Sequence, residues 1–596
     1  MNQFFKQILS SLIGTIAALL LIVTIGASGL IVLLLLLSQD GSPTVKDKTV
    51  LVFDLATKIR DTEPTITLSQ AFSQEEQPTL TLKQVLKNLD KARQDPHITA
   101  IFLDGRNSSG ARGSATSSEI RQALEAFQKA GKKIIAYGVD WDERDYYLTS
   151  IADEVILNPI GMMEMNGLGA QPLFYKGAFE KYGIGVQTVR VGNYKSAVEP
   201  YTRASLSPEN RQQLETLIGG IWQNFITTVA SSRKISPTQI QAIADNQGLL
   251  SAQEAKSKGF IDQIAYWDEV LAKLTTLSAK EEQTFRQIDL ASYSDVAVKS
   301  VPEKSSANKI AVVYAEGAIV NGDGTFETVG GDRFSRELRK IRNDDEVKAV
   351  VLRINSPGGS ATASEIILRE IQLIKAEKPV IISMGDVAAS GGYWMATGGQ
   401  HIFADPNTIT GSIGVFSLLF NTEKIGNNFG LTWDTVKTAK LADLSTSVRP
   451  KSELEIAIYQ QTVNKIYDLF LDKVSQSRKI PKEKVAEIAQ GRVWSGTEAQ
   501  KIGLIDEIGG LNSAITYAVA QTNLGQDWEV AEYPQKKSLE ATILRKLFNI
   551  QAFAEVNPSD PLTVEWEKFK QELGILQTFN DPKSVYARLP FNWIFN

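Results

Sequence analysis

The chain has 596 residues, of which 43% are hydrophobic and 22% charged, as is usual for a folded protein of more than one domain. Its 63 basic and 68 acidic residues give a net charge of −5 without a basic stripe, which argues against a nucleic-acid partner. There is no cysteine, which excludes thiolate chemistry, and the only two histidines, His97 and His401, are far apart in the sequence, which argues against a histidine-based metal site. We expect no metal and no cofactor.

The N-terminus carries a long apolar segment. No charged residue occurs between Lys6 and Asp40, and about 20 apolar residues suffice to span a bilayer. We therefore predict that residues 1–45 form a membrane anchor with one transmembrane helix at about 9–38. A cleaved signal peptide is the other interpretation, but its apolar core is only about 7–15 residues long. Lysines flank the segment on both sides, so charge alone does not orient the anchor.

The rest of the chain contains an internal repeat. Residues 131–195 align with residues 378–442 at a constant shift of 247. The identical pairs include Gly138 and Gly385, Tyr146 and Tyr393, Pro159 and Pro406, Gly167 and Gly414, Gly183 and Gly430, and Val189 and Val436. Further on, SAQEAKSKGFID (251–262) matches SGTEAQKIGLID (495–506). This duplication predicts two homologous domains, at 46–283 and 309–535, joined by a polar segment at 284–308 that is a linker or an edge strand.

Each copy has the pattern of an α/β domain. Apolar runs open the copies at 49–55 and 309–317, and helical stretches alternate with further apolar runs such as 379–385. Strands that alternate with helices in this way favour βαβ units around a largely parallel sheet. The C-terminal extension, residues 536–596, differs because aromatic residues are spread among polar ones. We expect it to pack against the second domain, and a position at the membrane surface is the alternative.

A candidate nucleophile lies in the second copy. Ser390 in AASGGYW (388–394) follows an apolar strand and precedes a predicted helix, and the adjacent glycines let backbone N–H groups approach a substrate carbonyl. The motif SPGG (356–359) ends the preceding strand in the same way. The amide of Gly391 and that of Gly358 or Gly359 are therefore candidates for an oxyanion hole. The alternative is that Ser390 only caps a helix.

A candidate base lies in the first copy. Lys195 in GNYKSAVEPYTR (192–203) is surrounded by apolar and small residues, and burial between two domains would lower its pKa toward neutrality, as a base requires. In the alignment Ser390 corresponds to Glu143 and Lys195 to Ala442, so each copy lacks what the other keeps. The sequence therefore predicts one serine–lysine pair assembled from both copies.

Taken together, these motifs with TGSIGV (410–415) and GRVWSGTEAQKIGLID (491–506) resemble the signal peptide peptidase A family, also called protease IV, in its long two-repeat form. The resemblance covers nearly the whole chain after the anchor. It implies two ClpP/crotonase-like domains, a homotetramer, and Ser–Lys catalysis. The family's nucleophile falls on Ser390, its base on Lys195, the serine that orients the lysine on Ser412, and its oxyanion amide on Gly391.

The resemblance also implies a biological setting. It describes a single-pass protein of a plasma, inner or thylakoid membrane, with its catalytic domains outside the cytoplasm. Its substrates would be cleaved signal peptides and other unfolded hydrophobic peptides, and an apolar site close to a bilayer anchor fits the same substrates. We expect small or apolar side chains before the scissile bond.

Three other functions remain open from the residues alone. One is a Ser-His-Asp hydrolase that uses His401 and Asp405, which follow Ser390 in the sequence. Another is a crotonase-type acyl-CoA enzyme, which would share the fold and the oxyanion hole but would not need Lys195. The third is an inactive membrane scaffold, which would not be expected to keep complementary halves of one catalytic pair.

Overall fold

The computed structural model describes residues 45–63, 79–107, 110, 112–279, 284–298, 305–325, 327–534 and 574–589. The transmembrane helix predicted at about 9–38 lies outside these residues. Within the described ranges, no helix combines the length and the apolar character that crossing a bilayer requires.

The first repeat is built on a six-stranded sheet whose paired strands all run parallel. Its strand order is β10, β6, β5, β4, β1, β11. These strands are β1 (Thr49–Asp54), β4 (Ile98–Gly105), β5 (Lys133–Gly138), β6 (Glu154–Leu157), β10 (Gln263–Ile264) and β11 (Gln287–Asp289). β11 lies within 284–308, so part of that segment is an edge strand of the first sheet.

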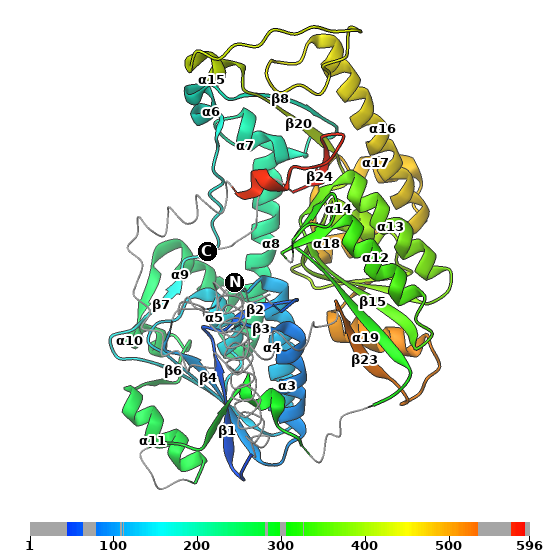
Figure 1. Cartoon of the computed structure of the whole chain (residues 1–596). Coiled ribbons are helices and arrows are strands. Elements are labelled where there is room, and N and C mark those ends of the chain that lie inside the picture. Colours follow the sequence, from blue (N-terminus) through cyan, green and yellow to red (C-terminus); the bar gives the residue numbers. More distant parts are fainter. Residues whose placement is uncertain are drawn as a thin grey trace, which may run out of the picture.

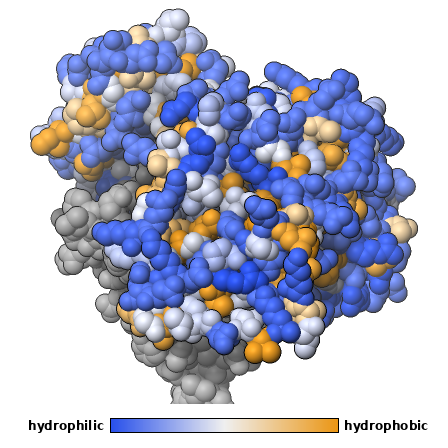
Figure 2. Space-filling view, turned by 90° about the horizontal axis from the view of Figure 1, so that it is seen from above, coloured by the Kyte–Doolittle hydropathy of each residue, from blue (hydrophilic) through white to orange (hydrophobic). Residues whose placement is uncertain are grey.

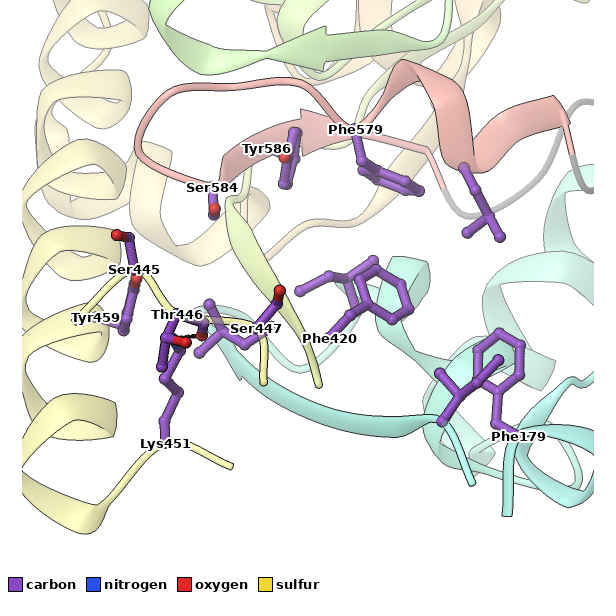
Figure 3. Close-up of a pocket in the computed structure, with 14 residues that line it drawn as sticks. Phe179, Phe420, Ser445, Thr446, Ser447, Lys451, Tyr459, Phe579, Ser584 and Tyr586 are labelled. Atoms are coloured by element: carbon purple, nitrogen blue, oxygen red, sulfur yellow. Dashed lines mark hydrogen bonds between the residues drawn. The ribbon is translucent and has the colours of Figure 1, made fainter. Parts of the chain in front are cut away.

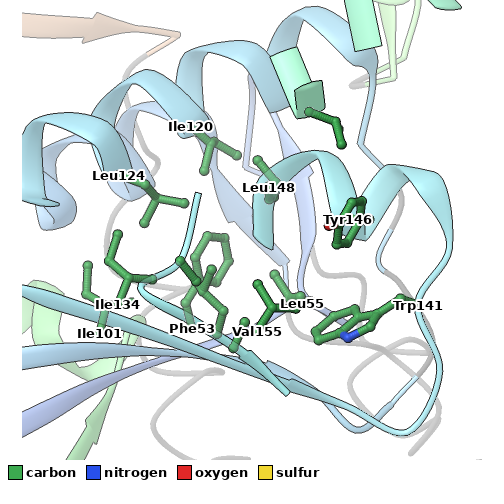
Figure 4. Packing of buried hydrophobic residues seen from close by; sticks show 14 of the residues in the cluster. Phe53, Leu55, Ile101, Ile120, Leu124, Ile134, Trp141, Tyr146, Leu148 and Val155 are labelled. Carbon is green, nitrogen blue, oxygen red and sulfur yellow. The ribbon is translucent and has the colours of Figure 1, made fainter. Parts of the chain in front are cut away.

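Successive side chains of these strands face two separate cores, because a strand alternates its side chains between the two faces of a sheet. Leu51 and Phe53 of β1 pack in one cluster with α3, α4 and α5, and Figure 4 shows Phe53 near Leu124 of α4 and Leu148 of α5. Val50 packs with α11 on the other face. The helices described in this repeat are α3 (Leu82–Gln94), α4 (Ser114–Lys129), α5 (Glu143–Thr149), α6 (Lys176–Tyr182), α7 (Glu199–Thr202), α8 (Pro208–Arg233), α9 (Pro237–Asn246), α10 (Ala252–Ser257) and α11 (Trp267–Leu277).

The second repeat repeats this architecture on an eight-stranded sheet. Its strands are β12 (Lys309–Glu316), β15 (Val347–Ser356), β17 (Val380–Ala389), β18 (His401–Ala404), β19 (Ile409–Gly411), β21 (Val493–Ser495), β22 (Glu507–Ile508) and β23 (Glu529–Tyr533). The central strands β12, β15 and β17 run parallel and are apolar on both faces, because helices cover both faces. The described helices are α12 (Gly331–Arg342), α13 (Ala361–Lys375), α14 (Gly391–Ala396), α15 (Glu423–Asn428), α16 (Glu453–Arg478), α17 (Lys482–Ile488), α18 (Gly496–Lys501) and α19 (Leu511–Ala520).

A third sheet joins the repeats and the C-terminal extension. Its order is β14, β13, β16, β24, β20, β8, and its strands are β8 (Gly185–Arg190), β13 (Ala318–Val320), β14 (Thr328–Gly330), β16 (Gly358–Ser360), β20 (Phe416–Asn421) and β24 (Val585–Arg588). β8 comes from the first repeat and pairs antiparallel with β20 of the second. β24 comes from the extension and runs antiparallel to both β16 and β20. Two short sheets, β2 (Lys58–Arg60) with β3 (Thr79–Thr81) and β7 (Met162–Met165) with β9 (Gly248–Ser251), complete the described strands.

Residues 166–202 of the first repeat form an extension that we call the first arm. In Figure 1 the first arm leaves the lower domain and reaches the top of the upper domain, where α6, β8 and α7 lie beside β20. Tyr175, Phe179 and Tyr201 of the first arm pack there with Phe416 and Tyr586 in one apolar cluster. The first arm therefore inserts a segment that contains Lys195 into the second repeat.

Candidate active site

Ser390 occupies the turn between β17 and α14. Its side chain is completely buried, and its backbone has φ 56° and ψ −112°, a conformation that non-glycine residues rarely adopt. The turn is held by a hydrogen bond of 2.8 Å from Ser390 N to Gly411 O. This strained strand-to-helix turn has the form of a nucleophile elbow, in which the backbone sets the direction of the serine side chain.

Lys195 meets this serine from the first arm. It lies just after β8 and is completely buried. Its Nζ is 2.7 Å from Ser390 Oγ, 3.0 Å from Ser412 Oγ and 3.1 Å from Ser412 O. Burial lowers the pKa of Lys195 well below its ordinary value, because the charged ammonium loses its hydration. The geometry therefore favours a neutral amine beside the hydroxyl.

Ser412 fixes the direction of that amine. It follows β19 with φ 50°, and its Oγ donates a hydrogen bond of 3.3 Å to Gly491 O. Because the Ser412 hydroxyl proton points to Gly491 O, Ser412 Oγ and Ser412 O are both available to accept hydrogen bonds from Lys195 Nζ. A neutral amine has two N–H groups and one lone pair; if Ser412 accepts from both N–H groups, the lone pair faces Ser390.

Two glycines surround the lysine side chain. Gly491 has φ 78°, and a Cβ at this position would lie 2.6 Å from Lys195 Cβ. A Cβ at Gly414 would lie 3.2 Å from Lys195 Cδ. The sequence argument missed the role of Gly491, although GRVWSG was among the motifs that carried the resemblance. A side chain at either glycine would therefore collide with or crowd the lysine stem.

The glycine motif SPGG lies next to Ser390. A Cβ at Gly358, which has φ 91°, would lie 2.6 Å from Gly391 N, so these two candidate oxyanion residues are adjacent. Gly358 N is 3.2 Å from Ser356 Oγ and donates to it. Gly359 is held inside the sheet, paired with Ile319 on one side and Ala587 on the other. Gly391 and Gly358 are therefore the better placed of the three candidates.

The C-terminal strand β24 runs directly past these glycines. The carbonyl oxygen of Ala587 would be 3.1 Å from a Cβ on Gly391, and it also abuts Gly358. Residues 585–589 are buried, and Leu589 N donates to Pro357 O at 2.9 Å. A peptide carbonyl of an extended chain thus fits beside the candidate oxyanion amides. The sequence argument expected the extension to pack on the second domain but did not predict this strand.

The equivalent positions of the other copy are arranged differently. Glu143 begins α5, and its carboxylate accepts hydrogen bonds from the backbone N–H groups of Asn166 and Gly167 at 2.6 and 3.0 Å. Ala442 is exposed, and the nearby Lys437 pairs with Asp443 at 2.5 Å. Neither position carries the serine or the lysine of the other repeat.

The alternative pair His401 and Asp405 is not arranged around Ser390. In the parallel pairing of β17 with β18, His401 lies opposite Ile381. Ser390 is nine residues further along the chain, which at about 3.3 Å per residue is about 30 Å away. His401 instead stacks on Tyr517 at a centroid distance of 4.2 Å. This placement rules out His401 as the base for Ser390 in this conformation.

An apolar cavity of about 410 Å³ lies between the first arm and the second repeat. Figure 3 shows Phe179, Phe420, Phe579 and Tyr586 around it, with Ser445 to Ser447 and Lys451 on the opposite side. Tyr586 precedes Ala587 in β24, and successive strand side chains face opposite sides of a sheet, so the cavity lies on the face away from the Ala587 side chain. Its lining suits an apolar side chain.

Sequence comparisons identify the family. The sequence model of peptidase family S49 matches residues 126–281 and 372–525, once in each repeat, and that of Clp protease matches residues 303–410. Protease 4 of Haemophilus influenzae is 37% identical over 516 residues, which cover 84% of this chain and 83% of that protein. The chain belongs to peptidase family S49. It is thus a serine peptidase with two ClpP-like α/β repeats, and the resemblance stated from its motifs is confirmed.

Two further relatives of this S49 peptidase are also proteases and are similar to it over most of its length. Protease 4 of Salmonella typhi is 35% identical over 85% of this chain and 83% of its own length. Serine protease SPPA, chloroplastic, of Arabidopsis thaliana is 35% identical over 75% of this chain and 66% of its own length. The likeness therefore extends over both repeats and the first arm, which together supply the buried serine and lysine.

Proposed function

We propose that this S49 peptidase is a membrane-anchored endopeptidase in which Ser390 is the nucleophile and Lys195 the general base. The observation that carries the proposal is the 2.7 Å approach of Lys195 Nζ to Ser390 Oγ with both side chains completely buried. A neutral amine at this distance can remove the hydroxyl proton as the serine attacks.

The reaction proceeds in two halves. In the first, Ser390 Oγ attacks the carbonyl carbon of the scissile peptide while its proton moves to Lys195 Nζ. The negative charge that develops on the carbonyl oxygen is stabilised by the amide of Gly391, with Gly358 adjacent. The C–N bond then breaks, and the Lys195 ammonium returns the proton to the leaving amine. In the second half, Lys195 takes a proton from water while the water oxygen attacks the ester carbon. The bond between that carbon and Ser390 Oγ then breaks, the carboxylic acid leaves, and the Lys195 ammonium returns its proton to Ser390 Oγ.

Ser412 acts through the lysine in this proposal. It accepts from the amine but takes no proton from Ser390, so its removal should weaken activity less than loss of Lys195. We expect Ser412→Ala to lower kcat and to shift the alkaline-rising limb of the pH profile. A purely structural role would lower Tm without moving that limb.

The proposed substrates are cleaved signal peptides and other unfolded hydrophobic peptides. Three features support this class: the apolar N-terminal segment, the apolar cavity beside β24, and an extended strand already seated next to the candidate oxyanion amides. Folded proteins would not present such a strand. The membrane is a plasma, inner or thylakoid membrane in this proposal, with the repeats on its extracytoplasmic side and the chains assembled as a homotetramer.

The test is covalent labelling of Ser390 by a serine-directed acylating probe, with hydrolysis of an apolar peptide measured in parallel. Ser390→Ala is the matched control and should show neither. A protein that hydrolyses acyl-CoA thioesters but not peptides would be a crotonase-type enzyme instead. A folded protein that does neither would be the inactive scaffold.

A further inference from the structure

The backbone of Lys195 lies in a turn between β8 and the short helical turn Ser196–Val198. Lys195 itself belongs to no helix or strand, so the regular bonds of a helix or a sheet do not fix its peptide groups. Its amine is nevertheless 2.7 Å from Ser390 Oγ, at the end of a flexible four-carbon stem. The position of the amine therefore depends on the groups that bind this turn from other elements.

Gln213 of α8 binds the turn on both sides of Lys195. Its Nε2 donates to Tyr194 O at 3.3 Å and to Ser196 Oγ at 3.1 Å. Its Oε1 accepts from Val493 N of β21 at 3.4 Å. Tyr194 and Ser196 belong to the first repeat and Val493 belongs to the second, so one amide group joins the turn that carries the base to the other repeat.

The strand that Gln213 contacts also holds the nucleophile in place. Val493 is the register partner of Gly411 in the pairing of β19 with β21. Gly411 O accepts a hydrogen bond of 2.8 Å from Ser390 N, and Ser412 follows Gly411 directly in the chain. Gln213 thus connects the backbone beside the base with the strand pair that fixes the nucleophile and the serine that orients the amine.

The burial of Gln213 is unusual for a polar side chain. Hydrophilic residues cover most of the face seen in Figure 2, where water can satisfy their polar groups. Gln213, in contrast, is only 4% exposed, and burying an amide costs free energy unless its groups are hydrogen-bonded. Acceptors lie on its nitrogen side and a backbone N–H lies on its oxygen side, so its orientation in this site is well defined.

A second set of side chains binds the turn and leads back to Gln213. Lys195 O accepts from Arg190 Nη1 at 3.2 Å, and Arg190 lies 3.8 Å from the buried carboxylate of Glu199. Glu199 Oε2 accepts from Asn210 Nδ2 at 2.9 Å, and Asn210 Oδ1 accepts from Gln213 Nε2 at 3.0 Å. These contacts enclose the Lys195 backbone in one polar network, in which Gln213 makes the contact with β21.

We propose that Gln213 is a positioning residue for the peptidase reaction: by joining the turn around Lys195 to β21, it holds the amine against Ser390 Oγ. This inference rests on the proposed function. A displacement of about 1 Å at a reacting group can cost about 100-fold in rate, so loss of the amide should lower kcat. Because the effect falls on proton transfer and not on substrate binding, KM should change little.

The test compares Gln213→Met with a matched buried amide elsewhere. Met keeps the length of the side chain and removes its polar groups. Asn88→Leu is the control, because Asn88 of α3 is 1% exposed and also donates to a backbone carbonyl and a serine hydroxyl, those of Leu290 and Ser294. Tm should fall in both variants. For peptide hydrolysis we expect kcat to fall about tenfold or more in Gln213→Met, with KM within about threefold, and to stay near the wild-type value in Asn88→Leu.

Ser196→Ala tests the same contact from the other side. It removes one of the two acceptors beside Lys195 and should lower kcat by about threefold, less than Gln213→Met does. Added to Gln213→Met, it should change kcat no further, because the bond that it removes is already lost. Additive losses in the double variant, or an unchanged kcat in Ser196→Ala, would contradict the proposed contact.

The remaining outcomes separate this inference from the proposed function. Equal losses of kcat in Gln213→Met and Asn88→Leu would reduce the effect to general stability, and an unchanged kcat in folded Gln213→Met would show that the turn holds Lys195 without the amide. Either result overturns the positioning role. A wild-type protein that does not hydrolyse peptides, or a Lys195→Ala variant that still does, would instead refute the serine–lysine peptidase itself.

Discussion

Lys195 Nζ and Ser390 Oγ lie 2.7 Å apart, although 195 residues separate them in the sequence. The lysine belongs to the first repeat and the serine to the second, and the first arm closes this distance. Neither repeat contains both groups. The duplication has therefore produced two ClpP-like domains that form one site together, and each prediction below follows from this shared arrangement.

Peptide hydrolysis should depend on the protonation of Lys195. Its pKa is well below the ordinary value because the amine is buried, and only the neutral amine can accept the Ser390 proton. Activity should thus be low at acidic pH and rise as pH passes upward through this lowered pKa. The measurement is kcat/KM against pH. A profile that falls as pH rises through the neutral range would contradict a lysine base.

The same burial should destabilise the folded protein. Burial makes Lys195 lose its proton at a lower pH in the folded protein than in the unfolded chain, where the ordinary pKa is about 10.4. The unfolded state thus binds more protons between the two pKa values, and stability increases with pH in that window. Lys195→Met should therefore raise Tm at pH 7, by an amount equivalent to about 1.4 kcal/mol for each pKa unit lowered, and should flatten the pH dependence.

Thermal unfolding in detergent at pH 7 and at a pH near 10 measures this effect. Lys440→Met, at an exposed position, is the control and should change neither Tm nor its slope with pH. A lower Tm for Lys195→Met at pH 7 would mean that the lysine contributes net stability.

Gly491 should be sensitive to a single methyl group. A Cβ there would lie 2.6 Å from Lys195 Cβ at a φ of 78°, so Gly491→Ala should displace the lysine and lower kcat by about 100-fold. Gly525→Ala is the matched control, because Gly525 also has positive φ, at 60°, but nothing lies within 4 Å of an added Cβ. It should lose stability of about 1 kcal/mol and keep its activity. Equal loss of activity in both would point to a general backbone effect.

The contact between the repeats should depend on Arg353. This arginine is completely buried and lies 3.0 Å from Asp61 and 2.8 Å from Glu119, both of which come from the first repeat. Arg353→Met leaves two buried carboxylates without their cation, which costs about 3–5 kcal/mol. Arg336→Met, which removes an exposed pair with Asp323, should cost less than about 1 kcal/mol. Denaturant unfolding of both variants compares the two losses.

Most of the predictions made from the sequence came from the alignment of the two repeats. The constant shift between the copies identified the two domains and showed that Ser390 and Lys195 have no counterparts at Glu143 and Ala442, while apolar runs alternating with helical stretches indicated the α/β class. The glycines of ASGG and SPGG marked two turns that the structure brings together beside Ser390, where the positive φ of Gly358 and the close approach to Gly391 favour glycine.

The third sheet could not be predicted in the same way. β8, β20 and β24 come from three distant parts of the chain, and local periodicity carries no information on which strands pair. Gly491 was missed for a related reason, since its importance comes from the proximity of Lys195, almost 300 residues away in the sequence. The predicted anchor at about 9–38 lies outside the described residues and stays a prediction.

The most direct test of the shared site is peptide hydrolysis by Lys195→Ala, compared with the wild type and Lys440→Ala at matched folding. We predict that Lys195→Ala loses about 10³-fold or more of kcat while Lys440→Ala stays within about threefold, and that Lys195→Arg fails like the alanine variant because guanidinium remains protonated. Substantial activity in Lys195→Ala would contradict the mechanism, since no other base contacts Ser390 Oγ in the part of the chain that the structure describes.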